Sequence, residues 1–140
     1  MTRNDVLDLI VRWQNAAAGR DVETYAACYA DTAQIDSPMA GAVTGREGAV
    51  KVFTAFFSAF PDGVFVWEEP IIDGPRIAAV AGVSGTSVGD FMGLPPSGKA
   101  FRVSMVFLLD VHDGLIVRDR RNYDFTGWLV QVGVLRAKPV

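Results

Sequence analysis

The spacing of apolar residues changes near residue 63, and this change constrains the fold more than any other feature of the sequence. Up to residue 60, apolar side chains recur at intervals of three and four residues, which is the spacing of amphipathic helices. We predict helices over residues 5–18, 22–29 and 45–60. The predicted N-caps are Asn4 or Asp5 for the first helix and Asp21 for the second. A Pro-Asp-Gly sequence at residues 61–63 ends the third helix.

After residue 63 the composition favours strands. We predict long strands here over residues 64–72, 77–88, 101–111 and 115–125, and one short strand earlier, over residues 33–36 between the second and third helices. Helices followed by a run of antiparallel strands indicate the α+β class. We therefore expect a curved, antiparallel-rich mixed sheet wrapped around the three helices of the N-terminal half. Such a sheet forms a cone, and the wide end of a cone can hold a ligand pocket.

Length, charge and residue types narrow the class of protein. The chain has 140 residues, which predicts one domain over residues 1–140. Its formal net charge is −3, so we expect no nucleic acid and no membrane among its partners. One histidine and one cysteine leave few ligands for a transition metal, and we expect no metal site. The N-terminal segment carries acids where a signal peptide has its apolar stretch, which favours a cytoplasmic protein.

Aromatic residues are spread over the predicted helices and strands, and several could line the cone. Ligand pockets are mostly apolar, with a few aimed polar groups. The side chains that we expect to contact a small hydrophobic ligand are Trp13, Phe53, Phe57, Trp67, Phe91 and Trp128. Each of them could instead belong to a closed core.

The segment RDRRNYDFTGWL, residues 118–129, carries the candidate catalytic groups. On a regular strand alternate side chains share a face, so Arg120, Asn122 and Asp124 would point together. A β-bulge would exchange part of this assignment. If this face lines the cone, Asp124 could be the acid–base group, with Asn122 or Arg120 donating to a developing enolate oxygen. Alternatively, Asp124 caps a turn or helix that begins at Thr126, or pairs with Arg120.

Three stretches together resemble one known family. YADTAQIDSPMAG followed by TGREGAVKVFTAFFSAFPD is similar to the front half of SnoaL-like polyketide cyclases, within the nuclear-transport-factor-2-like superfamily. GTSVGDFMGLPPSGKAFRVSMVFLLDVHDGLIV resembles their central hairpin, and NYDFTGWLVQVG resembles their closing strand. The resemblance covers nearly the whole chain.

This resemblance implies a cystatin-like α+β cone, a homodimer, a hydrophobic pocket and no cofactor. It also implies a role for Asp124, which holds the closing-strand position of the cyclase aspartate. In the cyclases, that aspartate is the acid–base group of an intramolecular aldol ring closure. Asn122, two residues earlier, can form hydrogen bonds but cannot titrate.

Relatives in the same superfamily leave other reactions open. Ketosteroid isomerases carry a catalytic aspartate directly before a proline, whereas here Ser37 holds that position and Asp36 precedes it. Limonene-type epoxide hydrolases use an Asp–Arg–Asp set, which Arg102 or Arg118 with Asp124 could imitate in part. The sequence favours a cofactor-independent acid–base enzyme, an aldol-type polyketide cyclase or related isomerase, acting on a small hydrophobic carbonyl compound. The alternative is a non-catalytic binding or dimerisation module of the same fold.

Overall fold

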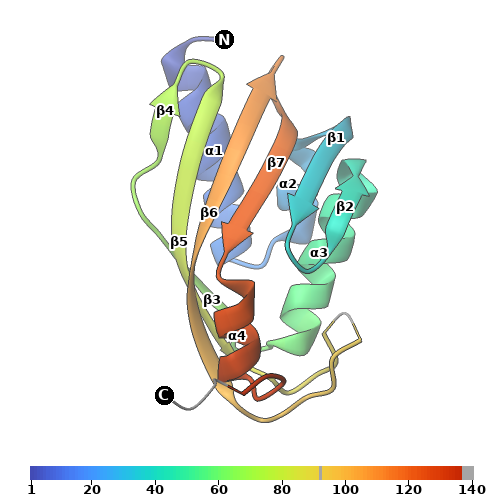
Figure 1. Ribbon diagram of the computed structural model, residues 1–140. Coiled ribbons are helices and arrows are strands. Elements are labelled where there is room, and N and C mark those ends of the chain that lie inside the picture. Colours follow the sequence, from blue (N-terminus) through green and yellow to red (C-terminus); the bar gives the residue numbers. More distant parts are fainter. Residues whose placement is uncertain (92, 137–140) are drawn as a thin grey trace.

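The computed structural model describes residues 1–91 and 93–136 and has the expected α+β architecture (Figure 1). In these residues the helices are α1 (Arg3–Ala18), α2 (Val22–Ala27), α3 (Gly45–Ala59) and α4 (Phe125–Gln131). The strands are β1 (Tyr29–Ser37), β2 (Gly41–Thr44), β3 (Val64–Trp67), β4 (Ile71–Asp73), β5 (Arg76–Thr86), β6 (Ala100–His112) and β7 (Leu115–Tyr123).

The strands form one open, mixed sheet in the order β2-β1-β7-β6-β5-β3, with β4 also paired to β5. The neighbours β1 and β7 run parallel, and the other paired strands run antiparallel. Figure 1 shows α1, α2 and α3 on one side of the curved sheet, and α4 beyond the end of β7. The predicted arrangement of a curved sheet around the helices of the N-terminal half is confirmed.

Side chains cap the first two helices. Thr2 is the N-cap of α1: its hydroxyl accepts from the N–H of Asp5, and the Asp5 carboxylate accepts from the N–H of Thr2 at 2.8 Å. The cap is therefore neither of the two predicted residues, Asn4 or Asp5, and Asp5 instead forms the other half of a capping box. Asp21 caps α2, as predicted, by accepting from the N–H of Thr24.

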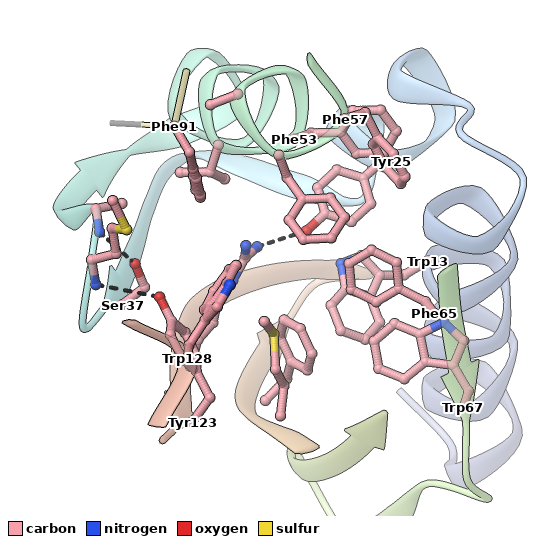
Figure 2. A pocket seen from close by; sticks show the side chains of 18 residues that line it. Trp13, Tyr25, Ser37, Phe53, Phe57, Phe65, Trp67, Phe91, Tyr123 and Trp128 are labelled. Atoms are coloured by element: carbon pink, nitrogen blue, oxygen red, sulfur yellow. Dashed lines mark hydrogen bonds between the residues drawn. The ribbon is translucent and has the colours of Figure 1, made fainter. Parts of the chain in front are cut away.

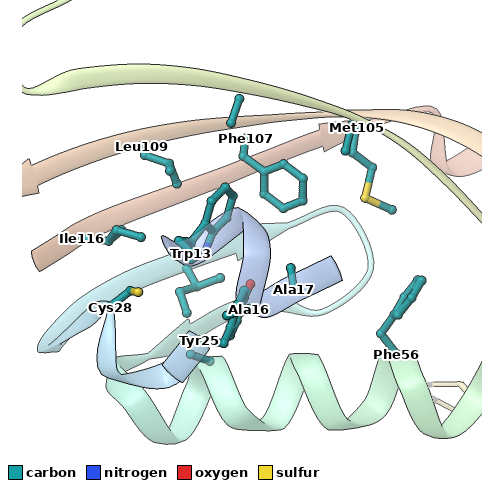
Figure 3. Packing of buried hydrophobic residues seen from close by; sticks show 14 of the residues in the cluster. Trp13, Ala16, Ala17, Tyr25, Cys28, Phe56, Met105, Phe107, Leu109 and Ile116 are labelled. Carbon is teal, nitrogen blue, oxygen red and sulfur yellow. The ribbon is translucent and has the colours of Figure 1, made fainter. Parts of the chain in front are cut away.

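The inward side chains of β5 and β6 meet α1 in the core. Along β6, every second side chain is buried, as the two-residue period of a strand requires: Phe101, Val103, Met105, Phe107, Leu109 and Val111. Trp13 of α1 is fully buried against this row, and its ring centroid lies 5.2 Å from that of Phe107 (Figure 3). The paired inward positions of β5 are Ala79 and Ala81, whose small side chains leave room for the indole.

Three predicted strands differ clearly from the observed ones, and the first is the short strand predicted over residues 33–36, which is longer and forms β1 (Tyr29–Ser37). The strand predicted over residues 64–72 is divided into β3 and β4, and Pro70, which has no N–H to donate, lies in the break. The last predicted strand ends at Tyr123 instead of residue 125, and residues 125–131 form α4.

Two details of the predicted helices also differ. Tyr29, expected at the end of the second helix, is the first residue of β1 and is fully buried. The spacing of apolar residues in the third predicted helix also predicts that Val50 faces the core, but Val50 is 39% exposed, whereas Val52 and Phe56 are buried.

Candidate functional site

A hollow lies between the concave face of the sheet and the helices, and we call it the main hollow (Figure 2). About 670 Å³ of space free of atoms is counted there, a figure that includes open solvent at the mouth. Eleven of the 18 lining residues are aromatic, and they come from all four helices, from β3, β6 and β7, and from the β5–β6 connection. The aromatic lining residues are Trp13, Tyr25, Phe53, Phe56, Phe57, Phe65, Trp67, Phe91, Phe107, Tyr123 and Trp128.

The structure brings together all six aromatic side chains that the sequence analysis expected at a ligand. Trp13, Phe53, Phe57, Trp67, Phe91 and Trp128 all line the main hollow. They include the three tryptophans of the chain. That these side chains bind a substrate stays a prediction.

Arg121 is the one charged side chain among the described residues that line the main hollow. Only 13% of its side chain is exposed, and its guanidinium carbon lies 5.1 Å from the centre of the Phe107 ring. This geometry permits a cation–π contact. The guanidinium also donates to the Tyr25 hydroxyl at 2.6 Å. An apolar wall thus contains one fixed positive charge.

A buried carboxylate holds this arginine in place. Asp119 has no exposed surface, and its Oδ2 lies 3.0 Å from Nη2 of Arg121. The Tyr29 hydroxyl donates to the same Oδ2 at 2.6 Å, and the indole N–H of Trp13 donates to the Tyr29 oxygen at 2.9 Å. These four residues and Tyr25 form one connected network, which we call the Asp119 cluster.

The direction of the hydrogen bonds in the Asp119 cluster leaves one proton available to the hollow. A carboxylate only accepts, so Tyr29 gives its single proton to Asp119 and accepts from Trp13. The Tyr25 oxygen accepts from Arg121, and Tyr25 retains its own proton. That proton can go to the Tyr29 oxygen, 3.2 Å away, or to an acceptor in the hollow that Tyr25 lines.

Burial and charge set the protonation states of Tyr25, Tyr29 and Arg121. Burial raises the pKa of Tyr25 above its ordinary value and raises the pKa of Tyr29 further. Burial alone would lower the pKa of Arg121, but the adjacent Asp119 carboxylate more than compensates and raises it well above its ordinary value. Near neutral pH the two phenols are therefore neutral and the guanidinium is charged.

A second polar group lies on another side of the main hollow. The Tyr123 oxygen accepts from the N–H of Met39 at 3.3 Å, and Ser37 accepts from the N–H of Ala40 at 2.9 Å (Figure 2). Burial raises the pKa of Tyr123, so its phenol is neutral and can donate a hydrogen bond. The hollow thus offers Tyr25, Tyr123 and Ser37 as neutral polar groups beside Arg121.

The predicted catalytic set does not line the main hollow, and its expected placement is wrong. Asp124 is exposed and is the N-cap of α4, where its carboxylate accepts from the N–H of Gly127 at 2.9 Å. Asn122 is exposed. Arg120 points to the outer face of the sheet, where it borders a shallow depression with Leu108. The alternative role of Asp124 as a helix cap is the one observed.

A β-bulge explains this difference. The pairing of β6 with β7 shifts between Asp110 and Val111: Asp110 faces Arg118 while Val111 faces Ile116, so Val117 is an extra residue. The bulge exchanges the two faces of β7 beyond this point. Asp119, Arg121 and Tyr123 therefore point inward, and these are residues that the sequence analysis placed on the opposite face.

The residues considered for related reactions lie elsewhere. Asp36 is half-buried on β1 and does not line the main hollow, whereas its neighbour Ser37 does. Arg118 and Arg102 are exposed, and neither lines the main hollow. The isomerase and epoxide hydrolase sets are therefore not assembled at the main hollow. Among the described residues, no cluster of metal-ligating side chains occurs and no helix is long and apolar enough to cross a membrane.

The capping role of Asp124 predicts a modest and purely structural effect of its removal. Asp124→Ala should lower the free energy of unfolding by about 1 kcal/mol, because the Gly127 N–H loses its acceptor. Urea unfolding measures this loss, and ligand affinity of the main hollow should not change. If Asp124→Ala kept the stability of the wild type but lost most of its activity on a genuine substrate, Asp124 would have a catalytic role.

Comparisons with known proteins identify relatives of the whole chain. Residues 8–132 match the family model described as SnoaL-like polyketide cyclase. No match was found among curated proteins. Among solved structures, a candidate SnoaL-like polyketide cyclase from Jannaschia sp. CCS1 is 23% identical, with 97% of this chain and 94% of that chain covered and a TM-score of 0.83.

Two further solved structures come from Streptomyces. TsrD from Streptomyces laurentii is 24% identical, with 96% of this chain and 99% of that chain covered and a TM-score of 0.83. IdmH from Streptomyces antibioticus, a candidate polyketide cyclase, is 28% identical, with 90% and 96% covered and a TM-score of 0.74. Solved structures described as having a ketosteroid isomerase-like fold and as nuclear-transport-factor-2-like are also among the matches, with TM-scores of 0.76 and 0.77, which confirms the expected fold.

Proposed function

The chain belongs to the SnoaL-like polyketide cyclase family, and from this premise we propose that it binds a small hydrophobic carbonyl compound in the main hollow and promotes an aldol-type ring closure without a cofactor. The observation that carries the proposal is the position of Arg121. It is a single cation in an aromatic wall, held by the buried Asp119 carboxylate. A preorganised cation in a site of low polarity stabilises negative charge on a ligand oxygen.

The chemistry follows from the groups that line the main hollow. A 1,3-dicarbonyl compound loses a proton from the carbon between its carbonyls to water, and Arg121 stabilises the resulting enolate oxygen. The enolate carbon then attacks a third carbonyl, further along the same molecule, which forms the carbon–carbon bond, closes the ring and leaves an alkoxide. Tyr25 or Tyr123 gives its proton to the alkoxide and recovers a proton from water. The net reaction is an isomerisation, and the protein acts through charge stabilisation and general acid catalysis.

A non-catalytic binding protein is the second candidate. The specific observation in its favour is that the described lining residues of the main hollow include no carboxylate and no histidine. A binder would hold the same ligand without accelerating ring closure. Incubation with an aryl-substituted linear poly-β-ketone, followed by chromatography, distinguishes the two because only the enzyme increases the rate at which cyclised product appears.

Ligand titration tests the role of Arg121. We expect 1-phenyl-1,3-butanedione to bind as its enolate, with its pKa about 1–3 units lower in the complex than in water, because an adjacent cation favours the charged form. Ultraviolet absorbance reports the enolate, and quenching of the three tryptophans that line the hollow reports binding.

The informative variant is Asp119→Asn/Arg121→Met, which removes both charges of the buried pair together. It should abolish the shift in the ligand's pKa. Arg118→Met is the matched control, because Arg118 lies on the same strand, is exposed and does not line the hollow. An equal shift in the double variant and the control would remove Arg121 from the proposed site.

A further inference from the structure

A second hollow adjoins the main one, and we call it the side groove. About 330 Å³ of space free of atoms is counted there, open solvent at its mouth included, and most of its lining residues come from the β5–β6 connection, from α4 and from the residues that follow α4. Met39, Phe91 and Trp128 line both hollows, so the two share a boundary made of these side chains. The rings of Phe91 and Trp128 meet edge to face, with centroids 5.5 Å apart.

The chemistry of the side groove differs from that of the main hollow. None of the described residues that line it is charged, and Ser87 is its one polar lining side chain. The Ser87 hydroxyl already accepts from the N–H of Ser97 at 3.2 Å. Phe60 and Val132, which also line the groove, are buried. This surface can therefore gain free energy from an apolar group and offers little to a polar one.

We infer that the side groove holds the apolar tail of the same ligand whose oxygen-bearing head lies at Arg121. This inference rests on the proposed function and adds the substrate class: a 1,3-dicarbonyl head that carries an alkyl or aryl extension. The tail crosses the boundary beside Met39, whose unbranched thioether side chain adapts its shape more readily than a ring does. Compact carbonyl compounds occupy the main hollow alone.

The affinity of the ligand should depend on the length of its tail. Each methylene group that moves from water into an apolar site contributes enough to tighten binding about fourfold. A ligand series that lengthens only the tail should therefore show stepwise gains while the tail fills the groove. The gains should end once the tail reaches the rim, where Val134 is 41% exposed.

The experiment uses 1-phenyl-1,3-butanedione and homologues whose terminal alkyl group is extended by two, four and six methylenes. Tryptophan quenching gives the dissociation constant of each compound. The wild-type protein should bind each longer homologue more tightly, by up to about fourfold per methylene. Val134→Glu places a carboxylate at the groove rim and should flatten this dependence without changing the affinity for the shortest compound. Val66→Glu is the control, since Val66 is 65% exposed and lines neither hollow.

Three outcomes would overturn the inference. The first is a wild-type affinity that does not depend on tail length. The second is an affinity that rises with tail length equally in Val134→Glu and Val66→Glu, which would reflect the general hydrophobicity of the ligand. The third is loss of self-association in Val134→Glu, measured by sedimentation, without any effect on tail dependence, which would assign the groove to a second copy of the chain. In each case an intact Arg121-dependent enolate titration of the shortest compound would leave the proposed function standing.

Discussion

Arg121→Met is expected to lower the free energy of unfolding by about 3–5 kcal/mol, because it leaves a buried carboxylate without its counter-charge. Asp119 has no exposed surface, and Arg121 is the cation paired with it, with Nη2 and Oδ2 3.0 Å apart. After the substitution, Tyr29 still donates to the carboxylate, but one neutral hydrogen bond does not replace a charged partner. Urea unfolding of the variant and the wild type measures the difference.

The double variant Asp119→Asn/Arg121→Met should recover much of the lost stability. It removes both charges together, so no uncompensated ion remains, and replacing a buried ion pair with neutral groups is often close to neutral. A double-mutant cycle with Asp119→Asn alone gives the coupling energy of the pair. Arg118→Met, on the exposed face of the same strand, should stay within about 0.5 kcal/mol of wild type. A loss below about 1 kcal/mol for Arg121→Met would show that Asp119 is not held as a buried anion.

The aromatic part of the site could be predicted from sequence because it depends little on register. Large aromatic side chains on the helices and strands of a small cone are mostly buried in its interior. The rings of Phe53 and Phe57 on α3, Trp67 on β3 and Trp128 on α4 all reach the main hollow. They do so although the strand predicted over residues 64–72 is divided into β3 and β4, and the strand predicted to end at residue 125 ends at Tyr123.

The polar part could not be predicted because one extra residue reverses it. Side chains on a strand alternate with a period of two, so the bulge at Val117 exchanges the inward and outward sets. Nothing in the run Leu115–Ile116–Val117 marks the bulge, since all three residues suit a strand. Regular alternation therefore predicts Arg120 and Asn122 on the inward face, where the fold has Asp119 and Arg121.

The Asp119 cluster illustrates a second limit of sequence reasoning. Tyr29 and Asp119 are separated by 90 positions in the sequence, yet their side chains share a hydrogen bond of 2.6 Å. The contact follows from the parallel pairing of β1 with β7, which has its own register shift between Tyr29 and Gln34. Periodicity reports which face of an element is buried, but it does not report which buried residues of distant elements meet.

Trp13→Ala is the second substitution expected to have a large effect, lowering the free energy of unfolding by about 3–5 kcal/mol. Trp13 has no exposed surface, and its ring lies 4.9 Å from that of Trp67 and 5.2 Å from that of Phe107. The substitution leaves a void and removes the indole N–H that donates a hydrogen bond to the Tyr29 oxygen. Trp13→Phe keeps most of the packing but loses that hydrogen bond. The hydrogen bond should account for about 1 kcal/mol of the loss in free energy of unfolding, and the contacts that the smaller ring does not make add to it.

Added indole distinguishes a void from a general loss of structure in Trp13→Ala. Because Trp13 lines the main hollow, the void should open onto it and admit an indole molecule. Indole at ten times its dissociation constant should raise the stability of Trp13→Ala by about 1.4 kcal/mol. The wild type and Trp13→Phe, in which this space is filled, should gain much less from the same concentration. Equal stabilisation of all three proteins would mean that indole binds at a place other than the void, for example in the main hollow as it stands in the wild type.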